Sequence, residues 1–195
     1  MILTGGTAAR LGGRDKASIE VGGRTLLERA LEAAASADPV VVVGEEVATS
    51  RKVVFAREEP AYGGPVAGLL AGRHAIHPTP DLLLVLAVDM PFVTSTTVDR
   101  LVAAVGQGDG AVLRAADGRR RLVLVVRTVR LDQMAPADPH GCPVHVLLAP
   151  LELREVPATG REGHGIDTAE DLRRLKSEGS GGSGVAARGK SRKPW

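Results

Sequence analysis

An unbroken apolar run at residues 82–88, followed at once by Asp89 and Pro91, constrains the fold of this chain more than any other feature. A run of this kind is typical of a strand buried on both faces of a parallel sheet. Open α/β sheets bind their ligands beyond the carboxyl ends of such strands. Because Pro91 ends the strand, we expect Asp89 to lie at a ligand-binding edge. The alternative is that Asp89 is an ordinary loop or helix-capping acid.

Extended and helical segments alternate along the rest of the chain. Strands are predicted at residues 1–4, 39–43, 53–56, 82–88, 110–115, 122–126 and 151–156, and helices at 25–36, 65–77, 95–105, 127–134, 143–149 and 168–176. Strands separated by helices predict a three-layer α/β/α, Rossmann-like fold with a mostly parallel central sheet. A turn at Asp117 and Gly118 joins two successive strands and predicts an antiparallel edge. Thr94 or Ser95 is expected to cap one helix, and Thr168 with Asp171 to form a capping box on the last.

Length and composition limit the classes of protein that this chain can represent. The 195 residues favour one domain at residues 1–178, followed by a flexible Gly/Ser and basic tail at 179–195. The net charge is +2 and aromatic residues make up 2% of the chain, so we expect no nucleic-acid partner. A single cysteine excludes an internal disulfide. No segment matches a signal peptide or a membrane span, so we expect a cytoplasmic protein with no membrane partner.

The tail contains a false match to a phosphate-binding motif. Residues 184–191 fit the P-loop pattern, but a Gly/Ser linker precedes them and only four residues follow. A P-loop needs a strand before it and a helix after it. We therefore predict no nucleotide site in the tail.

A glycine-rich basic loop follows the first predicted strand. Its glycines include Gly5 and Gly6, and its cations include Arg10 and Lys16. Glycines let backbone N–H groups surround an anion, and Arg and Lys side chains suit phosphate oxygens. The loop therefore predicts a phosphate site, and the alternative is an ordinary flexible loop.

Two further segments are expected near this edge of the sheet. The turn at residues 58–68 is shaped by glycines and prolines, and its backbone with Glu58 or Glu59 suits a base or ribose, unless it is a plain surface loop. Asp167 precedes the last predicted helix, where its alternative role is an N-cap. Asp89 and Asp167 together predict a Mg²⁺ site, because magnesium takes one or two carboxylates with substrate phosphates and water. These parts suit phosphoryl or nucleotidyl transfer.

Five spaced segments resemble the nucleotidyltransferase superfamily and, within it, the molybdenum cofactor guanylyltransferases. Residues 3–16 resemble the LAGGxxxRMGGxDK signature, 22–27 a G-x-x-L-L segment, 64–68 a GPLAG turn, 89–91 a D-x-P metal motif, and 167–172 an N/D-T-P-E-D-L segment. The resemblance covers nearly the whole chain up to residue 176.

The resemblance implies that GMP is transferred from GTP to the terminal phosphate of molybdenum-bound molybdopterin, with Mg²⁺ as cofactor and pyrophosphate as by-product. It also implies residue roles: Leu3, Thr4 and Gly5 contact the guanine, Gly6, Arg10 and Lys16 handle the triphosphate, Glu58 and Gly64 lie beside the base or ribose, and Asp89 binds the metal with Asp167 as second ligand. Arg10, Lys16 and Asp89 are the implied catalytic residues. The implied partners are GTP, a molybdopterin-type acceptor and, transiently, molybdopterin-handling proteins.

Some positions depart from the family pattern. Thr4 replaces the usual alanine, Glu58 stands where an aspartate is expected, Gly165 precedes the last motif where asparagine is common, and Arg121 with Leu122 replaces a Gln-Pro pair expected near the acceptor.

Two other functions stay open. One is nucleotidyl transfer to a different acceptor: molybdopterin with CTP, a sugar phosphate, or a phospholactate-type acid. The other is a non-catalytic nucleotide-binding adaptor, against which the retained Lys16 and Asp89 argue.

Overall fold

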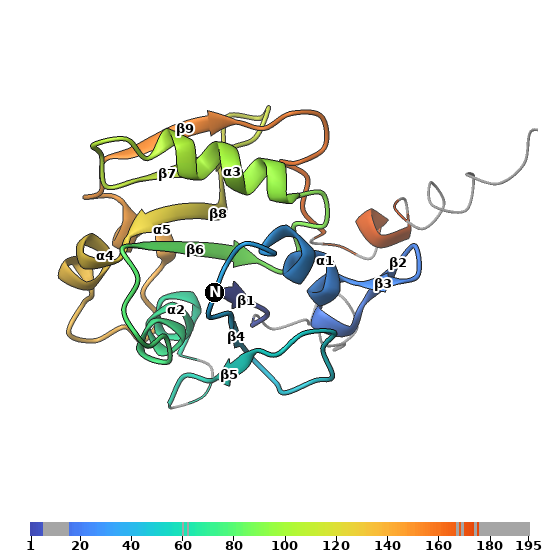
Figure 1. Cartoon of the computed structure of the whole chain (residues 1–195), viewed down its shortest axis with the longest axis horizontal. Helices are drawn as coiled ribbons and strands as arrows, with labels where there is room; N and C mark the ends of the chain where they lie inside the picture. The colour runs from blue at the N-terminus through green and yellow to red at the C-terminus, as the bar shows by residue number, and fades with distance from the viewer. Residues whose placement is uncertain are drawn as a thin grey trace, which may run out of the picture.

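The computed structural model describes residues 1–5, 16–59, 61, 63–166, 168, 170–173 and 175. Seven strands form one sheet in the order β5-β4-β1-β6-β8-β7-β9 (Figure 1). Their bounds are Ile2–Leu3 (β1), Val41–Val43 (β4), Val54–Ala56 (β5), Leu82–Ala87 (β6), Gly110–Arg114 (β7), Arg120–Arg127 (β8) and Leu153–Pro157 (β9). The sheet is parallel except at β8, which is antiparallel to β6 and to β7. The predicted mostly parallel sheet with antiparallel pairing toward one edge is confirmed.

The antiparallel direction of β8 follows from a tight hairpin after β7. The amide of Ala115 donates to the Arg119 carbonyl at 2.9 Å, and Gly118 has φ +80°, a conformation that favours glycine. The predicted turn at Asp117 and Gly118 is therefore confirmed. Because β8 runs against β6, the start of β8 lies beside the end of β6.

Helices cover both faces of the sheet and confirm the predicted three layers (Figure 1). Helices α1 (Leu26–Ala33) and α3 (Ser95–Ala104) pack on one face. Helices α2 (Pro65–His74), α4 (Thr128–Met134) and α5 (Val144–Leu148) pack on the other. The strand residues alternate between the two cores, as the period of a strand requires.

The central strand shows this alternation clearly. Leu86 belongs to the core under α1 and α3, whereas Leu83 and Val85 belong to the core under α2. Apolar residues on both faces explain why the 82–88 run has no alternating polar positions.

Side chains cap the helices where the sequence predicts. The Thr94 hydroxyl accepts from the Thr97 amide at the start of α3. The Asp171 amide donates to the Thr168 hydroxyl at 3.1 Å, and the Thr168 amide donates to Asp171 Oδ2 at 2.9 Å. Both predicted caps are confirmed, and residues 170–173 and 175 are helical.

Three short elements near the N-terminus were not predicted. They are a 3-10 helix at Lys16–Ser18 (η2) and the hairpin of β2 (Glu20–Val21) and β3 (Arg24–Thr25). The sequence signal is weak because each element is only two or three residues long. The predicted tail at 179–195 lies outside the described residues. Within the described part of the chain, no helix is long and apolar enough to cross a membrane.

Candidate active site

Four parallel strands end together at one edge of the sheet. The Thr4 amide donates to the Val43 carbonyl at 3.0 Å, the Val88 amide to the Leu3 carbonyl at 3.0 Å, and the Gly44 amide to the Ala56 carbonyl at 2.9 Å. These bonds bring the residues that follow β1, β4, β5 and β6 to a common edge. Leu3, Thr4, Glu58 and Asp89 all come from strand ends that meet there.

Thr4 is held at this edge by hydrogen bonds to Val43, the last residue of β4, and fits there because Gly44 has no side chain. Its hydroxyl donates to the Val43 carbonyl at 2.9 Å, and Thr4 is 5% exposed. A Cβ atom at Gly44, which has φ +151°, would lie 1.9 Å from Thr4 Oγ1. Thr4 therefore occupies space that only a glycine at position 44 leaves open. Gly5, which follows, is exposed.

Lys16 and Asp89 meet at this edge. Lys16 Nζ donates to Asp89 Oδ2 at 2.8 Å, and the two side chains are 16% and 23% exposed. Lys16 is held there because η2 packs on the protein: Ala17 is buried, and the Ile19 amide donates to the Lys16 carbonyl at 3.2 Å. The structure thus brings the cation of the N-terminal loop to the acid after β6. Gly6 and Arg10 lie outside the described residues.

Glu58 and Gly64 lie on the β5–α2 side of the edge. Gly64 is the N-cap of α2 with φ +91°, and a proline occupies the first turn. A Cβ atom at Gly68 would lie 3.7 Å from Glu58 Oε2 and 3.4 Å from Val43 Cγ1. Glu58 therefore approaches the first turns of α2 where that helix packs on β4.

Residues just before α5 also border the turn between β5 and α2. The sequence did not indicate this contact. The Gly141 amide donates to the Gly63 carbonyl at 2.9 Å. A Cβ atom at Gly63 would lie 3.3 Å from His140 Nε2. The contact joins segments far apart in sequence, and no motif marks it.

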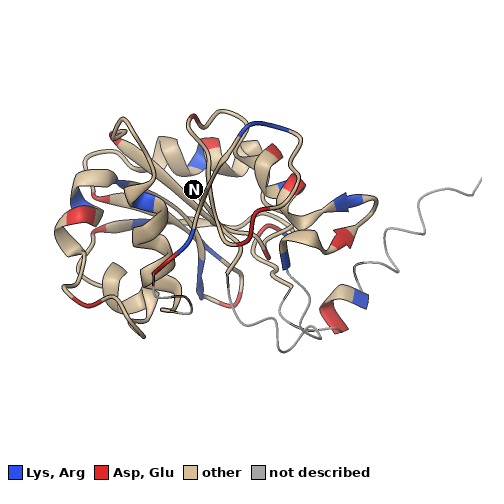
Figure 2. Cartoon of the chain, turned by 90° about the horizontal axis from the view of Figure 1, so that it is seen from below, with Lys and Arg blue, Asp and Glu red and all other residues tan. Residues whose placement is uncertain are grey.

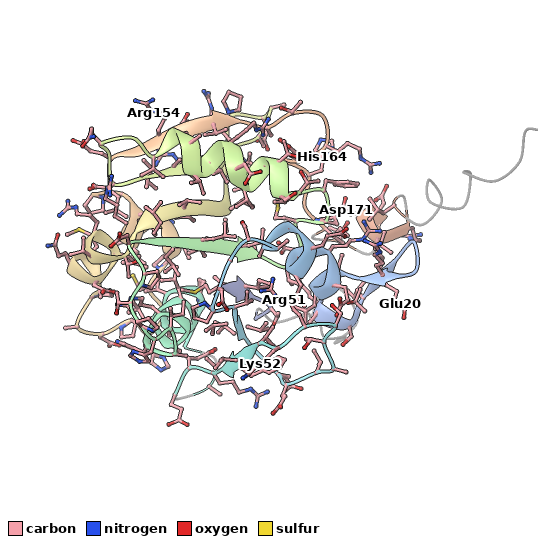
Figure 3. All side chains as sticks on the ribbon, in the orientation of Figure 1. Glu20, Arg51, Lys52, Arg154, His164 and Asp171 are labelled. Carbon is pink, nitrogen blue, oxygen red and sulfur yellow. The ribbon has the colours of Figure 1, made fainter. Side chains whose placement is uncertain are left out.

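A pocket of about 490 Å³ opens beside Asp89. Its basic lining comes from Arg120, Arg121, Arg161 and His164. The two arginines at the start of β8 reach it because β8 begins where β6 ends. Figure 3 shows His164 and Asp171, which also lines the pocket, at the same end of the molecule. The sequence predicted that Asp89, the Arg121 segment and the segment of Asp167 lie near a ligand, but it gave no role to Arg120 or Arg161.

The loop at residues 158–166 forms another wall of this pocket and is tied to the core by Glu162. Glu162 accepts from the Thr97 hydroxyl at 2.7 Å, from the Thr159 amide at 2.7 Å and from Arg100 Nη2 at 2.5 Å. Burial by itself raises the pKa of Glu162, but these hydrogen bonds more than offset it, and the pKa lies below its ordinary value. The Ile166 amide donates to the Asp89 carbonyl at 2.9 Å, so the loop and the acid are joined directly.

The carboxylate of Asp89 suits a Mg²⁺ ligand. Within the described ranges, no group of three or more His, Cys, Asp or Glu side chains could hold a metal ion. Mg²⁺ does not need such a group, because one or two carboxylates suffice when phosphates and water complete the shell. The predicted second ligand, Asp167, lies outside the described residues.

Another hollow, of about 510 Å³, lies over α1 and the β2–β3 hairpin. None of the candidate site residues that the structure describes lines it. Basic and acidic residues are interspersed along the ribbon (Figure 2). The site is therefore defined by the strand-end residues and the pocket at Asp89, and by no single basic face.

Solved structures share this fold. The molybdopterin-guanine dinucleotide biosynthesis protein A of Archaeoglobus fulgidus superposes with a TM-score of 0.71 at 21% identity, over 92% of this chain and 97% of that one. The 2-C-methyl-D-erythritol 4-phosphate cytidylyltransferase of Thermus thermophilus gives a TM-score of 0.66 at 22% identity, over 92% of this chain and 98% of that one. At these identities the likeness shows the fold alone.

Sequence comparison defines the family. The molybdenum cofactor guanylyltransferase of Shewanella sp. (strain MR-4) is 30% identical over 131 residues, which are 65% of this chain and 66% of the relative. The match thus spans just under two thirds of the relative's length. The family described as MobA-like NTP transferase domain matches residues 1–158. The chain therefore belongs to the MobA-like NTP transferase family of nucleotidyltransferases.

Proposed function

We propose that this protein transfers GMP from GTP to the terminal phosphate of molybdenum-bound molybdopterin and releases pyrophosphate. The observation that carries the proposal is the contact of Lys16 with Asp89 at 2.8 Å, at the edge where four strands end and beside a pocket with a basic lining. The name of the Shewanella relative supports the choice of nucleotide and acceptor.

The nucleotide would lie along the ends of β1, β4 and β5. Leu3, Thr4 and Gly5 would contact the guanine through their backbone, with Glu58 and Gly64 beside the base or ribose. The buried Thr4 supports this placement, because its bonds to Val43 fix the backbone just before the loop. Gly6, Arg10 and Lys16 would hold the triphosphate, for which Arg and Lys side chains are suited.

Asp89 would hold Mg²⁺, with Asp167 as a second ligand. The ion, when bound, supplies positive charge against the phosphate oxygens. Lys16 would then be released from Asp89 to a phosphate oxygen. Lys16 and the ion would both neutralise negative charge on the phosphates, so each would favour binding of the triphosphate.

The reaction would be a direct displacement at the α-phosphorus. An oxygen of the acceptor phosphate forms a bond to that phosphorus, and the bond from it to the bridging oxygen of the β-phosphate breaks. Pyrophosphate leaves with the electron pair. Such transfers depend on positioning and charge stabilisation more than on covalent help from side chains. Lys16 stabilises the developing charge, and the pocket beside Asp89 orients the acceptor.

A second acceptor class has one observation in its favour. The arginines beside Asp89 would suit any phosphorylated acceptor, including molybdopterin used with CTP, a sugar phosphate or a phospholactate-type acid.

The test is a transfer assay with purified protein, Mg²⁺, α-labelled GTP or CTP, and molybdenum-loaded molybdopterin. We expect labelled dinucleotide and pyrophosphate with GTP, and neither with the Asp89→Asn variant. Product with CTP but not with GTP, or with another acceptor but not with molybdopterin, would move the assignment to the second class. GTP binding without pyrophosphate from any acceptor would favour the adaptor.

A further inference from the structure

The pocket beside Asp89 combines basic and apolar linings, and Asp171 is a further acid in its wall. Arg120, Arg121 and Arg161 supply guanidinium groups. Met90 and Leu122 supply apolar surface. A ligand that matches both carries an anionic group and an uncharged organic part, unlike inorganic pyrophosphate, which is anionic throughout.

Arg121 is held in place by two hydrogen bonds that use only part of its N–H donors. Its Nε donates to the Gly163 carbonyl at 2.8 Å and its Nη2 to Asp117 Oδ2 at 2.9 Å, and the side chain is 26% exposed. A guanidinium has five N–H donors, and no other acceptor among the described residues takes one from Arg121. Arg120 Nε donates to Glu155 Oε1 at 2.9 Å. Both guanidinium groups are oriented by the protein before any ligand arrives.

Arg161 is oriented by stacking. Its guanidinium carbon lies 4.0 Å from the centre of the Phe92 ring, a cation–π geometry. The loop that carries it is fixed by hydrogen bonds from Thr97 and Arg100 of α3 to Glu162, and by the bond from the Ile166 amide to the Asp89 carbonyl. Arg161 therefore belongs to a wall whose position is coupled to that of Asp89.

We propose that Arg121 and Arg161, with Arg120 at the rim, form the subsite that holds the attacking phosphomonoester of the acceptor. The identification of this ligand as the acceptor rests on the proposed function. The chemistry of the ligand, a phosphomonoester, rests on the pocket alone. Planar guanidinium groups suit phosphate because two parallel N–H donors match two oxygens. The residues decide specificity: they select a phosphorylated acceptor over the corresponding alcohol.

The first test measures ligand binding without turnover. Phenyl phosphate is the probe, since it joins a phosphomonoester to an apolar ring, and phenol and pyrophosphate are the comparison ligands. We expect calorimetry or NMR to show binding of phenyl phosphate that weakens about tenfold or more in Arg121→Gln/Arg161→Gln. Arg154→Gln is the matched control, because Arg154 is exposed on β9 away from the pocket lining (Figure 3).

Three outcomes would overturn the subsite: no binding of phenyl phosphate to the wild-type protein, equal binding to the double variant, or binding of pyrophosphate at the same residues as tightly as phenyl phosphate. Arg161→Lys keeps the charge but loses the planar donor pair, and we expect it to weaken binding as well. The Arg161→Lys variant keeps Arg121 and its bond to the Gly163 carbonyl, so it tests the subsite even if loss of Arg121 disturbs the loop.

The second test separates this proposal from the proposed function. In the transfer assay, Arg161→Gln should raise the KM for the phosphorylated acceptor about tenfold and leave the KM for GTP unchanged. Transfer with an unchanged acceptor KM would overturn the subsite and keep the function. Absence of transfer by the wild-type protein, with phenyl phosphate still bound through the arginines, would overturn the function and keep the subsite.

Discussion

Lys16 Nζ lies 2.8 Å from Asp89 Oδ2, although 73 positions separate the two residues in the sequence. The cation comes from a 3-10 helix before β2, and the acid follows β6. In the absence of ligand each neutralises the other. Under the proposed function, a nucleoside triphosphate bound with a divalent cation gives each a new partner, so metal and nucleotide assist each other's binding.

Lys16→Ala should change the affinity for metal and the affinity for nucleotide in opposite directions. Without the lysine, Mn²⁺ alone should bind at Asp89 up to about fivefold more tightly, which corresponds to about 1 kcal/mol for such a pair. GTP should bind more weakly because a cation for its phosphates is gone. Titration of Mn²⁺ by electron paramagnetic resonance, with and without GTP, measures both.

Lys52→Ala is the control for that experiment, since Lys52 is exposed (Figure 3). If Lys16→Ala weakened the binding of Mn²⁺ and of GTP alike, Lys16 would not compete with the metal for Asp89.

Asp89→Asn should abolish transfer and leave the fold intact. The variant keeps the size of the side chain but loses the charge that a metal needs, so we expect kcat to fall by at least about 100-fold. Asp89 is a half-buried strand-end residue outside the core, so thermal unfolding should change little. Wild-type turnover by the folded variant would exclude Asp89 as the metal ligand.

Thr4 and Gly44 should be coupled in stability. Gly44→Ala places a Cβ atom 1.9 Å from Thr4 Oγ1 and strains a backbone with φ +151°, so it should cost at least about 2 kcal/mol of unfolding free energy. Thr4→Ala removes one buried hydrogen bond and should cost about 1 kcal/mol. The double variant should cost less than the sum, because the clashing oxygen is gone. Chemical denaturation of all four proteins measures the coupling.

Gly23→Ala is the matched control for the backbone effect. Gly23 has φ +76°, but nothing lies within 4 Å of the position that a Cβ atom would take there, so this variant reports strain without a clash. Strict additivity of the Thr4 and Gly44 changes would show that the clash relaxes without cost.

Glu162 should make the stability of the protein depend on pH in acid. Its pKa in the folded state lies below the ordinary 4.5, so the ionised form is the stabilising one. Its contribution is present above pH 4.5 and is lost as the pH falls through the folded-state pKa. The difference in unfolding free energy between wild type and Glu162→Gln should therefore be constant near neutrality and shrink in acid.

Hydrogen exchange checks where that contribution acts. Glu162→Gln should speed exchange of the Ile166 amide, which bonds to the Asp89 carbonyl, whereas Glu59→Gln at an exposed acid should not. Unchanged exchange at Ile166 would mean that Glu162 does not fix the loop.

The tail should be dispensable for transfer. Deletion of residues 180–195 removes the Gly/Ser and basic segment, including the false P-loop match. We expect kcat and both KM values within about twofold of the intact chain, because every residue proposed for the site precedes the deletion. A large loss of activity would assign the tail a part in the reaction.

Local patterns in the sequence determined the elements of the fold. The 82–88 run predicted β6 because a strand with two buried faces needs apolar residues at every position. The polar residues at helix starts predicted the caps at Thr94 and Thr168, since a hydroxyl there satisfies a free amide. Asp89 was placed at a ligand-binding edge for the same local reason: it is the first acid after a buried strand.

Only the tertiary structure decided how the site is assembled. The position of β8 between β6 and β7 brings Arg120 and Arg121 to Asp89, and Glu162 joins the 158–166 loop to α3. Neither relationship leaves a periodic signal, because strand order and direction depend on pairing between segments distant in sequence. Hydrophobic periodicity records which face of an element is buried, and it carries no record of which neighbour buries it.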